Sequence, residues 1–289
     1  MARLSKLLPS DAASPILFYP RTPTMMLAKP PLSQGHAARS LRILTAADRP
    51  DLRALGDALA TTAWPVFLNA DSTTVECWDR LYEPGLDRFQ LFALSTDEDG
   101  GERLVATANA IPFFWSTPED DSSLPQEGWG GVLAAGVRAF GHTVNALSAL
   151  SVVVSADKRG GDLAERMIMA MRAIAKASGF QAMVVPIRPT RKSHYPLETM
   201  ETYLSWMTEN GEPFDPWIRK HRRLGARVVG IAGHSMEVCA NVPQWARWTD
   251  LRFPVSGRYH VAGGLAPVEI DLAGNRGVYH EPNVWMRHF

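Results

Sequence analysis

The residues whose types and spacing best suit a binding or catalytic role lie mid-chain, in the segment Val154–Ala164. This segment reads Val-Ser-Ala-Asp-Lys-Arg-Gly-Gly-Asp-Leu-Ala. A strand is expected before this turn and a helix after it, so several backbone N–H groups point outward without intrahelical partners. With the helix dipole behind them, such amides bind an anion such as a pyrophosphate. Arg159 adds a permanent positive charge, and Gly160 and Gly161 allow a ligand to approach the backbone closely. A turn without a ligand is the alternative interpretation.

Other reactive motifs do not fit the chain. No Gly-Lys-Ser/Thr follows the turn as a Walker A loop requires, and the glycine spacing is not that of a dinucleotide fingerprint. A Gly-x-Ser-x-Gly nucleophile turn is absent from the sequence. His260, His280 and His288 lack metal-ligand spacing, so we expect no metal. Cys77, beside Trp78, is typical of a small buried hydrophobe, with a cysteine nucleophile as the alternative.

The elements around the turn are the most regular of the chain. A buried strand from Leu147 to Ser155 precedes it, and a helix follows to Ser178, where Gly179 ends it. The apolar residues of this helix recur on one face, as in a helix packed on a sheet. The next buried strand is Ala182–Ile187, and the two strands should be neighbours.

The flanking segments predict more strands and helices, which together give an α+β fold with a mixed sheet. Strands are expected at Leu41–Leu44, Phe89–Leu94, Leu104–Ile111, His260–Val261 and Val268–Leu272. Helices are expected at Ala46–Thr61 with Thr45 as its cap, Ser72–Tyr82, Leu197–Thr208 and Pro216–Leu224. A hairpin around Gly233-His234 would join strands Arg227–Ala232 and Ser235–Val242. The segment from Ser116 to Gly131 reads as an acidic loop. The acid-rich stretch from Asp97 to Glu127 is most simply a solvated surface, with attraction of a cationic substrate as the alternative.

The turn resembles the acetyl-CoA signature of the GCN5-related N-acetyltransferase superfamily. Val154, Arg159, Gly160 and Ala164 match that pattern, with Ala156 at its proline position, whereas Asp162 replaces a glycine. The resemblance implies a mixed, mostly antiparallel sheet flanked by helices, here with a C-terminal β-rich extension. It also implies acetyl-CoA or another acyl-CoA as co-substrate. The implied cofactor-binding residues are Val152, Val153 and Val154 for the pantetheine arm, and Arg159, Gly160, Gly161, Asp162, Leu163 and Ala164 for the pyrophosphate.

A second match lies at the end of the helix Pro216–Leu224. Members of the superfamily carry a tyrosine four residues before a glycine at this place, and the tyrosine commonly protonates the departing CoA thiolate. Here His221 stands four residues before Gly225. Histidine donates a proton near neutral pH, so the resemblance makes His221 the candidate catalytic acid. An exposed histidine in a basic helix is the alternative.

Two further segments carry functional side chains. The polar, aromatic stretch Pro189–Pro196 would suit a substrate-side loop, with His194 and Tyr195 as candidate substrate-binding residues, or equally a long surface loop. Near the C-terminus, Glu281 and His280 could act as a base, or Trp285 could pack in the core. Nine tryptophans indicate a sizeable apolar pocket without showing what fills it.

Composition restricts the class of protein. The chain has 289 residues, 46% hydrophobic, and a formal net charge of +0, which argues against nucleic acid or an anionic membrane as the main partner. Two cysteines argue against a disulfide scaffold, and no apolar run is long enough to span a bilayer, so we expect a cytoplasmic protein. The expected organisation is a Pro-rich arm over 1–39, an acyl-CoA-binding domain over 40–242 and a C-terminal extension over 243–289. The arm makes a homodimer the slightly favoured state.

The resemblance predicts an enzyme that transfers an acetyl or other short acyl group from acyl-CoA to a small-molecule amine. Direct attack by the amine needs orientation rather than a protein nucleophile, which agrees with the missing triad. A decarboxylase or S-acyltransferase acting on acyl-CoA and a carrier thiol remains one alternative. A non-catalytic acyl-CoA-binding module is the other.

Overall fold

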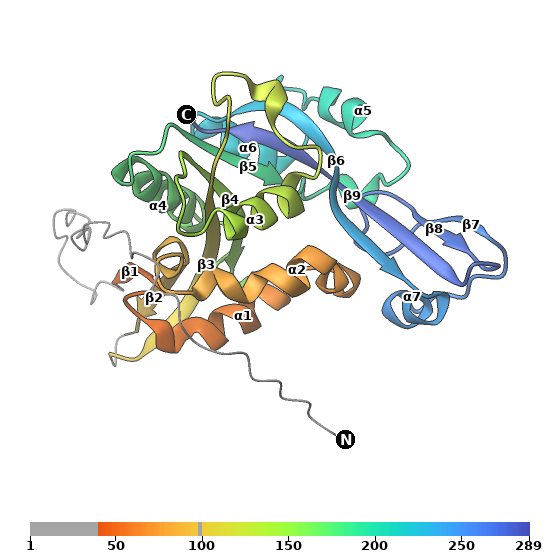
Figure 1. The fold of residues 1–289 in the computed structure, drawn as a ribbon, viewed down its shortest axis with the longest axis horizontal. Helices are drawn as coiled ribbons and strands as arrows, with labels where there is room; N and C mark the ends of the chain where they lie inside the picture. Colours follow the sequence, from red (N-terminus) through yellow and green to blue (C-terminus); the bar gives the residue numbers. More distant parts are fainter. Residues whose placement is uncertain (1–39, 98–99) are drawn as a thin grey trace. The chain divides into compact units, whose positions relative to one another are not determined.

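The computed structural model describes residues 40–97 and 100–289, so the predicted arm over 1–39 lies outside the described residues. Within the described part, one nine-stranded sheet has the order β1-β2-β3-β4-β5-β9-β8-β7, and β6 also pairs with β9 (Figure 1). Strands β4 and β5 are parallel, and the other neighbouring strands are antiparallel. The predicted α+β fold with a mixed, mostly antiparallel sheet is confirmed.

The strands are β1 (Leu41–Thr45), β2 (Leu91–Thr96), β3 (Glu102–Phe113), β4 (Ala146–Val154), β5 (Ala182–Ile187), β6 (Arg227–Ala240), β7 (Gly257–Tyr259), β8 (Val268–Asp271) and β9 (Arg276–Arg287). The helices are α1 (Arg53–Thr61), α2 (Ser72–Cys77), α3 (Gly128–Arg138), α4 (Leu163–Ala177), α5 (Met200–Ser205), α6 (Pro216–Arg223) and α7 (Val242–Thr249).

The sheet separates two apolar cores because successive side chains of a strand point to opposite faces. On β5, Ala182 and Val184 pack with α3, while Met183 and Val185 pack with α4 and α6. Helix α4 turns its apolar stripe, which includes Met167 and Met171, toward the second core. The two faces therefore have different helices, and the predicted neighbours β4 and β5 lie between them.

Helix α3 was not expected, because its sequence Gly-Trp-Gly-Gly-Val-Leu-Ala-Ala-Gly-Val-Arg is rich in glycine and reads as the end of a loop. The structure gives a packing reason for one of these glycines. A Cβ on Gly136 would lie 2.1 Å from Cγ1 of Ile111 and 2.7 Å from the backbone oxygen of Pro112. Gly136 thus lets the helix approach β3 more closely than any side chain would allow.

Replacing this glycine should therefore destabilise the fold. We expect Gly136→Ala to lower the free energy of unfolding by about 1–3 kcal/mol, because the added methyl group overpacks the contact with β3. Urea unfolding followed by circular dichroism measures the difference. Ala135→Ser, at a half-buried position of the same helix, is the control and should change stability much less. Unchanged stability in Gly136→Ala would mean that α3 does not pack this tightly.

Three other expectations differ from the structure. The helix expected from Ala46 begins only at Arg53: Thr45 and Asp48 do hydrogen-bond each other, but in a turn followed by the short 3-10 helix Pro50–Leu52. The expected helix Leu197–Thr208 is reduced to α5. The expected strand His260–Val261 lies just beyond β7.

The predicted hairpin around Gly233-His234 is wrong. Residues 227–240 form the single strand β6, which pairs along β9 with register irregularities, one of them between Ala232 and Met236 (Figure 1). The glycine and its neighbours therefore mark an irregularity in a strand rather than a turn. Strand β9, near the C-terminus, joins β6 to β5, and Trp285 on it is buried.

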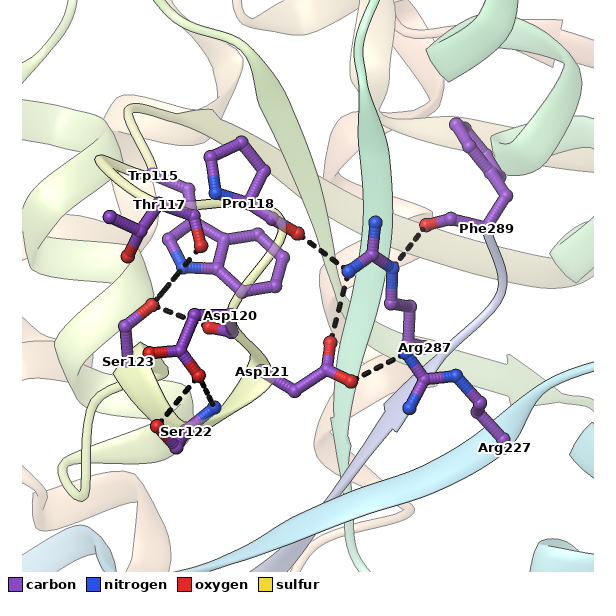
Figure 2. Close-up of polar contacts among 10 residues, drawn as sticks. All are labelled: Trp115, Thr117, Pro118, Asp120, Asp121, Ser122, Ser123, Arg227, Arg287 and Phe289. Carbon is purple, nitrogen blue, oxygen red and sulfur yellow. Dashed lines mark hydrogen bonds and ion pairs between the residues drawn. The ribbon is translucent and has the colours of Figure 1, made fainter.

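The acidic loop between β3 and α3 is attached to the C-terminal strand. Arg287 of β9 donates to the carbonyl of Pro118 at 2.6 Å and pairs with Asp121 at 3.0 Å. Both contacts are drawn as dashed lines in Figure 2. Arg227 pairs with the other oxygen of Asp121. Although partial burial favours the neutral acid, the two arginines hold the pKa of Asp121 below its ordinary value. Asp121 is therefore a structural anchor and is not available to attract a cationic substrate.

Candidate functional site

The parallel strands β4 and β5 separate after their first residues. They pair only from Ala146 to Ser148 on β4, whereas β4 continues to Val154 and stays paired with β3 on its other side. The candidate residues Val152, Val153 and Val154 all lie in the part of β4 that β5 does not cover. An extended ligand can add to such a free strand edge by backbone hydrogen bonds.

A buried polar network fixes the separation. Between Asn109 and Ala110 of β3 the register shifts, so that Leu150 of β4 is an extra residue, and such a bulge bends its strand. Ser151 donates to Asn109 at 2.8 Å, and the Asn109 side-chain amide donates to Gln90 and to Tyr82. The bulge in β4 is therefore held by hydrogen bonds among buried side chains of β3, β4 and the segment before β2.

The predicted turn is present between β4 and α4. Gly160 adopts a left-handed φ of +87°, and a Cβ at this position would meet no atom within 4 Å, so the turn is open to a ligand. No described residue accepts a hydrogen bond from the backbone N–H groups of residues 162–165. Arg159 folds back, its Nε donating to the Val154 carbonyl at 3.2 Å. Free amides at the start of a fifteen-residue helix suit a pyrophosphate.

Asp162 stands at the N-cap of α4 but does not cap it. Its side chain is exposed and makes no cap hydrogen bond, so its charge is not engaged by the free amides. Lys220 of α6 pairs instead with Glu165 at 2.8 Å, which brings a cation to the first turn of α4.

Removing the charge at Asp162 should improve the phosphate site. We expect Asp162→Asn to lower the KM for acetyl-CoA about two- to fivefold, because a repulsion of the size of a surface ion pair disappears, and the gain should shrink at high salt. Steady-state kinetics at two salt concentrations measure it. Asp157→Asn is the matched control, since the Asp157 carboxylate in the same turn is already paired with Arg103 at 2.7 Å. An unchanged or higher KM in Asp162→Asn would place the phosphates elsewhere.

The structure does not favour His221 as a proton donor. Its side chain is buried, 2% exposed, and its Nδ1 lies 3.0 Å from Nε2 of His288. Burial, with the nearby His288 and Lys220, lowers the pKa of His221 to about 3, so the ring is neutral at pH 7. His288 in turn is hydrogen-bonded through its backbone to Met183, where β4 and β5 are still paired. His221 thus faces the closed end of the strand pair, and its catalytic role stays a prediction that this geometry does not support.

His194 and Tyr195 also lie away from any described cavity. Tyr195 packs edge-on against Trp206 at 4.8 Å and against Phe214 at 5.8 Å, in an aromatic cluster on the α6 side of the sheet. His194 is exposed. Their assignment to substrate binding stays a prediction.

A pocket of about 280 Å³ lies on the opposite face, among α1, the segment that follows it, α2 and α3. Trp64, Trp78 and Trp129 border it together with Asp57 and Met236. The only sequence signal for it was the number of tryptophans, because residues far apart in the chain form it. Trp129 connects the pocket to the separated strands, since its Nε1 donates to the carbonyl of Leu150 at 2.9 Å.

An open β4 edge, a turn of free amides and a separate pocket on the other face are the features expected of an acyl-CoA-dependent acyltransferase. The comparisons agree with this class. The chain is 35% identical over 271 residues to the arginine N-acetyltransferase avaD of Aspergillus versicolor, which covers 84% of this chain and 92% of the relative. No family model matches the sequence.

Among solved structures, the loading GNATL domain of CurA from Lyngbya majuscula is similar at 17% identity and a TM-score of 0.51, covering 86% of this chain and 96% of that domain. The GphF GNAT-like decarboxylase in complex with isobutyryl-CoA follows at 16% identity and a TM-score of 0.47, covering 86% and 98%. The chain belongs to the GCN5-related N-acetyltransferase superfamily. The prediction of an N-acyltransferase is confirmed. No helix in residues 40–97 and 100–289 is long and apolar enough to cross a membrane.

Proposed function

We propose that this protein transfers the acetyl group of acetyl-CoA to the α-amine of arginine or of a small molecule that carries an arginine side chain. The observation that carries the proposal is the 35% identity to an arginine N-acetyltransferase over nearly the whole of both chains. The pocket bordered by Trp64, Trp78 and Trp129 contains the carboxylate of Asp57, which supports a cationic acceptor.

In this proposal acetyl-CoA binds at the turn before α4 and along the free edge of β4. The amides of residues 162–165 with Gly160 and Gly161 hold the pyrophosphate, and the β4 edge at Val152–Val154 holds the pantetheine arm and aims the thioester at the gap. The neutral amine attacks the thioester carbonyl directly, and a free β4 N–H stabilises the oxyanion. The C–S bond then breaks, the attacking nitrogen loses one proton, and the thiolate takes up a proton so that CoA leaves as the thiol. The guanidinium is permanently protonated and not nucleophilic, which leaves the α-amine as the reacting group.

The test is acetyl transfer by the purified full chain. Acetyl-CoA is incubated with arginine, ornithine, lysine and aliphatic amines, free thiol is followed with a chromogenic disulfide, and products are identified by mass spectrometry. We expect arginine to be acetylated faster than the other amines. Thiol release without an acetylated amine, or decarboxylation of malonyl-CoA in its place, would overturn the proposal.

A pair of glycine variants controls for the phosphate turn. Gly160→Val disturbs a left-handed residue of the turn, and Gly141→Val disturbs another left-handed glycine beyond α3, with φ of +82° and no atom near its Cβ. We expect only Gly160→Val to raise the KM for acetyl-CoA.

A further inference from the structure

The pocket bordered by Trp64, Trp78 and Trp129 has the chemistry of a site for a flat cation. We propose that it binds the guanidinium end of the acceptor, so that Asp57 and the three indoles select arginine and leave its α-amine free to react. This inference rests on the proposed function and assigns the specificity of the same enzyme to these four residues.

The indole rings form the apolar part of the site. Trp78 and Trp129 are stacked with centroids 6.1 Å apart and planes 16° apart, and Trp64 is tilted against Trp129 at 6.3 Å. Trp129 is 3% exposed, whereas Trp64 and Trp78 are partly exposed at the pocket. Tryptophan attracts cations over its ring more strongly than other aromatic residues do, and a planar guanidinium also stacks on it.

Among the residues that the structure describes, Asp57 of α1 is the only ionisable one that lines the pocket. Its Oδ1 lies 3.4 Å from Nε1 of Trp78, and its Oδ2 lies 3.5 Å from Nε of Arg53, a loose ion pair. Arg53 makes its closer contact with Asp79 and lies over the Tyr82 ring. Tyr82 also hydrogen-bonds Asp57. The contacts of Asp57 with Trp78 and Arg53 are long, and each carboxylate oxygen accepts more than one N–H, so a guanidinium can still hydrogen-bond both oxygens side by side.

The pocket lies within reach of the reacting atoms. Trp129 hydrogen-bonds Leu150, the bulged residue of β4, and Val152 follows two residues later on the free edge. Strand geometry puts about 7 Å between those two residues. The extended side chain of arginine spans a comparable length, so a guanidinium held beside Trp129 places the α-amine near the β4 edge.

The test compares arginine with citrulline, whose side chain has nearly the same shape but no charge. We expect the wild-type enzyme to prefer arginine, and Asp57→Asn to raise the KM for arginine about tenfold or more while the KM values for citrulline and acetyl-CoA stay unchanged. Glu76→Gln is the matched control, since it removes an exposed carboxylate of α2 that does not line the pocket. A separate titration follows arginine binding by calorimetry in the presence of CoA, which requires no turnover.

The outcomes separate this inference from the proposed function. If arginine is acetylated but Asp57→Asn weakens arginine and citrulline equally, the pocket assignment is wrong and the function stands. If arginine binds to wild type and not to Asp57→Asn, yet no amine is acetylated, the assignment stands and the proposed function is wrong. Arginine binding of equal affinity in both proteins overturns the assignment.

Discussion

Acidifying the protein from pH 7 to pH 5 should lower its free energy of unfolding by about 4 kcal/mol through His221 and His288 alone. The two rings lie 5.2 Å apart between centroids and are both buried. Burial lowers the pKa of His221 to about 3 and, with Arg172 nearby, that of His288 to about 4. In the unfolded chain both regain the ordinary histidine pKa of about 6.5.

Stability falls with acid because the two states bind different numbers of protons. Between about pH 4 and pH 6.5 the two histidines are protonated in the unfolded state and neutral in the folded state. Acid therefore favours unfolding, and stability rises with pH. Each ring also has a buried nitrogen without a hydrogen-bond partner among the described residues, Nε2 of His221 and Nδ1 of His288. In either charged ring this outer nitrogen would carry an N–H without an acceptor, which makes the charged form still more costly.

Urea unfolding at pH 7 and pH 5 measures the loss. The control is the double variant His221→Gln, His288→Gln, whose stability should fall less between the two pH values because glutamine does not titrate. Histidine ring resonances in NMR spectra give a second readout that needs no variant: neither ring should titrate between pH 5 and pH 8. A ring that titrates near pH 6.5 would contradict the prediction and would restore His221 as a proton donor.

The central unit of the fold could be predicted from the sequence because its signals are local. The β4 strand, the turn at Gly160, the amphipathic helix α4 and the stop at Gly179 each depend on neighbouring residues and on one period. The resemblance of this turn to the superfamily signature indicated that its ligand is the pyrophosphate of acyl-CoA. A short match in one turn therefore located the candidate phosphate site.

What the sequence could not predict depends on contacts between distant segments. Gly136 serves a close approach to Ile111, so glycine there reads as a loop signal although the segment is helical. Strand β6 continues past Gly233 because β9, forty residues further on, pairs along it. The pocket has the same origin, since Asp57 and Trp129 meet only when α1 and α3 cover the same face.

His221 shows the limit of the family pattern itself. The spacing to Gly225 is that of the superfamily, and the residue does lie on the expected helix. Its environment is set by His288, sixty-seven residues away near the C-terminus, which no local motif reveals. The motif predicts where His221 lies in the fold, whereas the protonation state of its ring depends on residues that the tertiary structure brings beside it.

Arg188→Ala should cost about 3–5 kcal/mol of stability, the usual loss when one partner of a buried ion pair is removed. Glu281 on β9 has no exposed surface, and Arg188, directly after β5, is its ionic partner. Tyr279 also donates to Glu281, and Arg188 donates to the carbonyl of Gly263. The pair thus ties the end of β5 to β9 and to the segment around Gly263, and its loss leaves a carboxylate buried with one hydroxyl donor.

The pH dependence of the stability loss tests whether the unpaired charge of Glu281 causes it. Burial already raises the pKa of Glu281, and Arg188 opposes that rise, so Arg188→Ala should raise the pKa further. A carboxyl with a raised folded-state pKa stabilises the protein at low pH and loses that contribution as the pH rises. The stability difference between wild type and Arg188→Ala should therefore be smaller at pH 5 than at pH 8, measured by urea unfolding at both.

Two further variants distinguish charge from packing. Adding Glu281→Gln to Arg188→Ala removes the unpaired charge and should recover a good part of the loss, because the amide oxygen still accepts from Tyr279. Arg191→Ala, an exposed arginine three residues on, should change stability by no more than about 0.5 kcal/mol. If Arg188→Ala is destabilised equally at both pH values and Glu281→Gln recovers nothing, then Arg188 stabilises the fold by packing and by its bond to Gly263, and Glu281 is not the reason for its position.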